Sequence, residues 1–136
     1  MIGPNSVLEN NKAIEFNNYK IYRKDHSPGK WGVAILVKDE IPQSEIKIRT
    51  NLEQVSVKIH YKGKQMSVTS LYLPNQIRFS KIELSNLNSQ LLHNKIILGD
   101  VNSNNTLWGS KRTCSRGGTI VRFLSECNLV TLNKKK

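Results

Sequence analysis

The sequence predicts a mixed α/β domain, an α+β sandwich built on a hairpin-rich sheet. Alternating or β-branched segments fill the first half of the chain, whereas amphipathic helical patterns occur only in the second half. The hydrophobic content of 38%, to which 8 glycines are added, is close to that of globular domains. The length of 136 residues corresponds to a single domain.

Four strands are expected ahead of the first helix, at residues 19–23, 32–38, 54–60 and 65–73. The second is an apolar, β-branched run typical of a buried strand. The last two form a hairpin whose turn is expected at residues 61–64. Pro74 ends the fourth strand, because proline has no N–H to donate to a neighbouring strand.

Two helices and two further strands follow. Residues 80–83 read SKIE, a capping-box pattern that predicts a helix beginning there and ending near residues 93–94. Leucines at three- and four-residue spacing give this helix one apolar face, at Leu84, Leu87 and Leu91. Next come a short strand at residues 95–98, a helix marked by Ile120, Leu124 and Cys127, and a last strand at residues 129–132.

The basic residues are concentrated in the second part of the chain. Of the formal net charge of +11, residues 54–136 contribute +10, from 13 basic and 3 acidic side chains. This favours a polyanionic partner, most simply nucleic acid; the alternative interpretation is a lysine-rich solvated surface. Membrane spans, a secretory signal and a zinc site with CxxC spacing are not indicated by the sequence.

Polar side chains follow two of the predicted strands and are the candidates for chemistry. Asp100 and Asn102 come directly after an apolar strand, at the edge where α/β folds bind ligands. Tyr72 and Asn75 follow the fourth strand in the same way. Each pair also has a simpler interpretation as a strand-end turn. Trp108 lies in a polar loop, where it either packs against the sheet or stacks on a base.

A series of motifs extends this pattern along the chain. They read YKIYRKD at residues 19–25, GVAILVK at 32–38, SLYLPN at 70–75, GDVNSNNTLWG at 99–109, RGGTI at 116–120 and LVTLN at 129–133. In this order they resemble the endonuclease domain of non-LTR retrotransposons of the jockey type. That domain is a branch of the endonuclease/exonuclease/phosphatase superfamily.

The resemblance implies a fold and a working context. The expected fold is the central part of a two-sheet, helix-flanked sandwich, truncated at both ends and spanning residues 19–133. Residues 1–18 are then a poorly defined leader, and residues 134–136 a basic tail. The implied activity is Mg²⁺-dependent hydrolysis of a DNA phosphodiester. The implied setting is intracellular and nuclear, with a reverse transcriptase domain in the parent polyprotein.

The resemblance also implies roles for individual residues. Asp100 orients or activates the attacking water, while Asn102 and Tyr72 contact the scissile phosphate. A second group is assigned to substrate binding, namely Asn75, Asn104 and Trp108. No residue is assigned as a metal ligand, because Asn5 stands where the family has its metal-binding glutamate.

The family's catalytic histidine segment also has no match, since the histidines of this chain lie in other contexts. An amide cannot replace the carboxylate that holds Mg²⁺, so weak or absent Mg²⁺ binding is expected. We therefore expect the isolated chain not to cleave DNA. The alternative function is a non-catalytic, basic nucleic-acid-binding remnant.

Overall fold

The computed structural model describes residues 17–25, 32–74, 78–100 and 115–130, with only the backbone of Asp100. In these ranges it contains strands and helices in the order β1 (Tyr19–Lys24), β2 (Val33–Lys38), β3 (Gln43–Glu45), β4 (Glu53–Tyr61), β5 (Lys64–Tyr72), α2 (Lys81–Ser89), β6 (Lys95–Asp100) and α3 (Ser115–Glu126). The predicted α/β class is confirmed.

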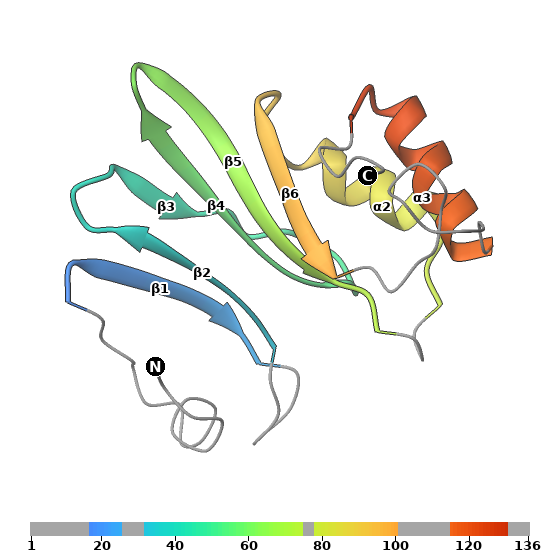
Figure 1. The fold of residues 1–136 in the computed structure, drawn as a ribbon, viewed down its shortest axis with the longest axis horizontal. Helices are drawn as coiled ribbons and strands as arrows, with labels where there is room; N and C mark the ends of the chain where they lie inside the picture. The colour runs from blue at the N-terminus through green and yellow to red at the C-terminus, as the bar shows by residue number, and fades with distance from the viewer. Residues whose placement is uncertain (1–16, 26–31, 75–77, 101–114, 131–136) are drawn as a thin grey trace, which may run out of the picture.

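The strands form two sheets. Strands β1 and β2 pair antiparallel in a two-stranded sheet. The larger sheet has the order β3-β4-β5-β6, in which β5 and β6 are parallel and the other neighbours antiparallel. Figure 1 shows α2 and α3 together on one side of this sheet, with the β1–β2 pair toward the other. The described part is thus layered as sheet, sheet and helices.

The predicted hairpin between β4 and β5 is confirmed. Its turn residues Lys62 and Gly63 both have positive φ, at 51° and 78°. Two consecutive positive φ values are the signature of the type I′ turn, whose twist matches that of the flanking strands. This turn fixes the register of the hairpin, in which Tyr61 pairs with Lys64 and Glu53 pairs with Tyr72.

Two separate hydrophobic clusters pack against the two faces of the larger sheet. The inner core lies between the two sheets and consists of Tyr22, Val33, Val37, Val55 and Val57. The helix-side core joins the sheet to α2 and α3 and consists of Leu52, Leu71, Leu73, Leu84, Leu87, Ile120 and Phe123. The consecutive β5 residues Leu71 and Tyr72 pack against opposite cores, as the period of two of a β-strand requires.

The capping box of α2 is formed as predicted. The Ser80 hydroxyl accepts a hydrogen bond from the Glu83 backbone N–H at 3.2 Å, and Glu83 Oε1 accepts one from the Ser80 N–H at 3.0 Å. The predicted end near residues 93–94 is wrong, because the helix ends at Ser89. The Gln90 side chain there exchanges hydrogen bonds with the backbone N–H and carbonyl of Arg49, at 2.8 and 2.9 Å.

Three further differences concern short elements and helix bounds. Strand β3 was not expected, because its sequence QSE is polar and only three residues long. Helix α3 begins at Ser115, ahead of the apolar residues that marked it in the sequence. Of the predicted strand at 129–132, residues 129–130 are not in a strand, and the rest lies outside the described residues. Neither helix of the described part has the length and apolarity to cross a membrane.

Strand β6 leaves apolar surface uncovered. It has one neighbour, β5, in the described part of the sheet. Ile96 is 39% exposed and Leu98 56% exposed, although parallel strands are usually buried on both faces. An exposed edge strand with apolar side chains is a site of association between chains. We therefore expect the isolated chain to self-associate through this surface.

Leu98→Lys should reduce this self-association. An exposed leucine that becomes buried contributes about 1.5 kcal/mol or more, so its replacement by a charge should lower the association constant by about tenfold. Sedimentation equilibrium measures the constant. Ile82→Lys is the matched control, because Ile82 is 76% exposed on α2 and should leave association unchanged. Equal association constants for Leu98→Lys and the unchanged chain would contradict the expectation.

Candidate active site

Tyr72 and Asp100 lie next to each other at one edge of the larger sheet. Tyr72 is the last residue of β5 and Asp100 the last of β6. They are in register in the parallel pair, where neighbouring strands are about 4.8 Å apart. The half-buried Tyr72 packs against the inner core. The structure thus brings together two of the residues that the sequence assigned to catalysis.

Gly99 allows β6 to approach β5 closely beside this pair. A Cβ atom at position 99 would lie 2.3 Å from the carbonyl oxygen of Leu71, which is a clash with backbone. Leu71 is in register with Gly99 and precedes Tyr72 in the chain. Glycine at this position is therefore needed for the placement of Asp100 beside Tyr72.

Gly99→Ala should destabilise the protein by about 1–3 kcal/mol, because the added methyl group must push the two strands apart. Urea unfolding measures the change. Gly118→Ala is the control: the nearest atom to a Cβ there is Arg122 Nη1 at 3.7 Å, an ordinary contact within α3. It should be neutral or stabilising by up to about 1 kcal/mol, as alanine is in helices. Equal destabilisation by the two variants would show that the close approach at Gly99 is unimportant.

Glu53 lies in the same row of the sheet. It is the antiparallel partner of Tyr72 on β4, and directly opposed residues point to the same face. Glu53 is buried, with 9% of its surface exposed. The sequence interpretation missed it, although a signal was present. Glu53 is in phase with Val55 and Val57, so the alternation places an acid at an inward-facing position.

Arg116, near the start of α3, contacts the chain where it leaves β5. Its Nη2 donates a hydrogen bond to the carbonyl oxygen of Leu73 at 2.8 Å. Its guanidinium carbon lies 4.7 Å from the centre of the Phe79 ring. The RGGTI motif contains Arg116, but the sequence pattern assigned it no role.

The remaining candidates lie outside the described residues: Asn75, Asn102, Asn104 and Trp108. Their assignments stay predictions. Among the residues that the structure describes, no group of three or more Asp, Glu, His or Cys is placed to hold a metal ion.

Comparison with known proteins supplies the family. Residues 66–136, more than half of the chain, match the family described as endonuclease-reverse transcriptase. The chain belongs to this family. The matched region contains Tyr72, Asp100 and Arg116. Glu53 lies outside it. No curated protein sequence matches the chain.

The fold of this endonuclease-reverse transcriptase family member is similar to a solved structure, "Endonuclease domain of TRAS1, a telomere-specific non-LTR retrotransposon". The TM-score is 0.75 over 88% of the present chain, with 23% sequence identity. At this level of sequence identity, the similarity shows that the two chains share a fold. The chain spans 57% of the length of the TRAS1 chain.

Proposed function

We propose that this chain is the central part of a Mg²⁺-dependent DNA endonuclease of a jockey-type non-LTR retrotransposon. The domain would occupy residues 19–133, within a polyprotein that also carries a reverse transcriptase and works in the nucleus. The observation that carries the proposal is the in-register placement of Tyr72 and Asp100 at the shared end of β5 and β6. Family membership and the positive charge of residues 54–136 support it.

The proposed chemistry is hydrolysis of a phosphodiester by water. Asp100 accepts a proton from the attacking water or orients it, a role that suits a carboxylate at the end of a strand. The Tyr72 hydroxyl and the Asn102 amide donate hydrogen bonds to phosphate oxygens as negative charge develops there. Asn75, Asn104 and Trp108 hold the substrate beside this centre.

The donor set of the described residues fits Mg²⁺ only in part. Mg²⁺ takes oxygen ligands and often only one or two protein carboxylates, with water and substrate phosphate supplying the rest. Asp100 supplies one carboxylate at the proposed centre, and Glu53 lies in the same row on the other side of Tyr72. Among the described residues, no group of three or more Asp, Glu, His or Cys is placed to hold a metal ion. Bound Mg²⁺ would neutralise charge on the phosphate. With Asn5 at the family's glutamate position, we propose weak Mg²⁺ binding by this chain.

A second candidate function is nucleic-acid binding without cleavage. The observations that favour it are the net charge of +10 over residues 54–136 and the amide at position 5. Both functions require DNA binding, so they differ only in whether a domain with its missing segments restored can nick DNA. In our proposal the isolated chain binds DNA without nicking it, whereas a completed domain nicks.

The test is nicking of supercoiled plasmid by two proteins. One is the isolated chain, and the other is a completed domain, in which the chain is joined to the segments of the TRAS1 domain that it does not span. Each is assayed with Mg²⁺ and with EDTA. Nicking by the completed domain that requires Mg²⁺ would support the proposal. A folded completed domain that binds DNA but never nicks would favour the second function.

A further inference from the structure

One guanidinium group contacts the chain on both sides of residues 75–77. Leu73 follows directly on Tyr72, and Phe79 lies on the far side of the same connection, just ahead of α2. Arg116 hydrogen-bonds the first and stacks on the second. It is the second residue of α3, the helix that follows β6 in the chain. Arg116 thus links the start of α3 to both described ends of the connection between β5 and α2.

The environment of Arg116 requires arginine. A cation in the first turn of a helix is disfavoured by the helix dipole, so it needs compensation from other groups. The Leu73 carbonyl and the face of Phe79 provide it, the latter through a cation–π contact. A planar guanidinium serves both contacts at once, which a lysine ammonium cannot do.

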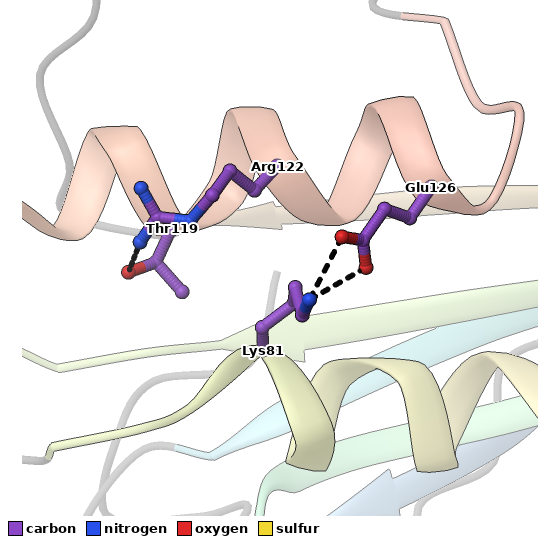
Figure 2. Close-up of polar contacts among 4 residues, drawn as sticks. All are labelled: Lys81, Thr119, Arg122 and Glu126. Atoms are coloured by element: carbon purple, nitrogen blue, oxygen red, sulfur yellow. Dashed lines mark hydrogen bonds and ion pairs between the residues drawn. The ribbon is translucent and has the colours of Figure 1, made fainter.

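The residues on both sides of the Arg116 contacts, namely Leu73 with Phe79 and the helix α3, are packed in the fold. Phe79 packs against the helix-side core, and Leu73 belongs to that core with 1% of its surface exposed. Gly117, next to Arg116, is buried as well. At its other end, α3 is joined to α2 by an ion pair in which Lys81 Nζ lies 2.7 and 2.8 Å from the Glu126 carboxylate oxygens (Figure 2). The helix that carries Arg116 is therefore packed on the helix-side core and linked to α2.

We infer that Arg116 is a positioning residue, which holds the end of β5 and residues 73–74 in the geometry that places Tyr72 at the active site. It acts through the Leu73 carbonyl and the Phe79 ring, rather than by binding DNA phosphate. This inference rests on the proposed function for the reaction, but the positioning itself is a property of the isolated chain.

Arg122 provides a matched control. It is an exposed arginine on the same helix, and its Nη2 donates a hydrogen bond to Thr119 Oγ1 of that helix at 3.3 Å (Figure 2). Arg122→Ala therefore removes the same charge from α3 without touching the chain that leaves β5. Arg116→Lys is the conservative variant, which keeps the charge and loses the planar group.

The first experiment is amide hydrogen exchange by NMR on the isolated chain, with urea unfolding alongside. Arg116→Ala should speed exchange at residues 71–73 and 78–80 by about tenfold, as expected when a local opening becomes easier. In Arg116→Ala, the exchange rates of the β1 and β2 amides should change by less than about twofold. In Arg122→Ala, the exchange rates at residues 71–73 and 78–80 should also change by less than about twofold. Arg116→Lys should restore less than half of the lost protection. Equal acceleration throughout the chain, or full rescue by lysine, would overturn the inference.

The second experiment measures nicking kinetics in the completed domain. Arg116→Ala should lower kcat by about tenfold or more with KM changed by less than about threefold, because positioning of the reacting groups is lost while DNA contacts remain. A rise in KM at unchanged kcat would instead identify Arg116 as a phosphate contact. A completed domain that fails to nick with Arg116 intact counts against the proposed function, whereas local exchange in the isolated chain still decides the positioning role.

Discussion

Asp100→Asn is expected to abolish Mg²⁺-dependent nicking by the completed domain, with a loss of about 10²–10⁴-fold in rate. The substitution keeps the shape of the side chain and removes the negative charge. An amide cannot accept the proton of the attacking water and is a poorer partner for Mg²⁺. Because Asp100 is in register with Tyr72 at the end of β6, the loss should fall on the chemical step.

DNA affinity provides the control for this variant. Removal of an acidic group from a DNA-binding surface should leave the dissociation constant unchanged or lower it, since repulsion of the phosphates is reduced. Glu45→Gln is a matched variant, because Glu45 is an exposed acid on β3, remote in the sheet order from β6. It should retain the full nicking rate. An Asp100→Asn domain that nicks at the unchanged rate would remove Asp100 from the site.

DNA binding by the isolated chain is expected to depend steeply on salt. If about four or five phosphates are neutralised, an increase from about 50 to 200 mM salt should lower the binding constant by about 10²–10³-fold, through loss of counterion release. Fluorescence anisotropy with duplexes of unrelated sequence measures the slope. The slope should be the same for each duplex, because contacts to phosphates carry no sequence information.

The β4–β5 turn supplies a control for charge placement. Lys62 and Lys64 are exposed at this turn, at the opposite end of the hairpin from Tyr72. The double variant Lys62→Gln, Lys64→Gln should therefore leave the salt slope unchanged. A flat salt dependence of the unsubstituted chain would contradict DNA binding and support the lysine-rich solvated surface. If the double variant lowers the magnitude of the slope of log binding constant against log salt concentration by about 2, the DNA contacts the turn instead.

Much of the fold is predictable because local patterns determine it. The alternation in β4, the positive-φ turn at Lys62 and Gly63 and the capping box at Ser80 each act within a few residues. The end of α2 is not predictable in this way, since it depends on hydrogen bonds between Gln90 and Arg49, 41 residues apart. Strand β3 was missed for a similar reason, because pairing with β4 determines it rather than its own polar sequence.

The candidate site, like the fold, contains residues that the sequence predicts and residues that it does not. Tyr72 and Asp100 could be found from the sequence, because each directly follows an apolar or alternating strand segment. Their register could not, as it depends on the close approach of β6 to β5 at Gly99. Glu53 enters the site only through cross-strand pairing, and Arg116 only through contacts with residues 37 and 43 positions earlier in the chain.

A double-mutant cycle on the nicking rate of the completed domain tests most directly whether Tyr72 and Asp100 form one site. Tyr72→Phe alone should slow nicking by about 10–10²-fold, since one donor to the phosphate is lost. Residues that act as a unit give non-additive losses, so the double variant should nick within about threefold of the rate of Asp100→Asn alone. Losses that multiply in full, or an unchanged rate for Tyr72→Phe, would contradict a shared active site at the end of β5 and β6.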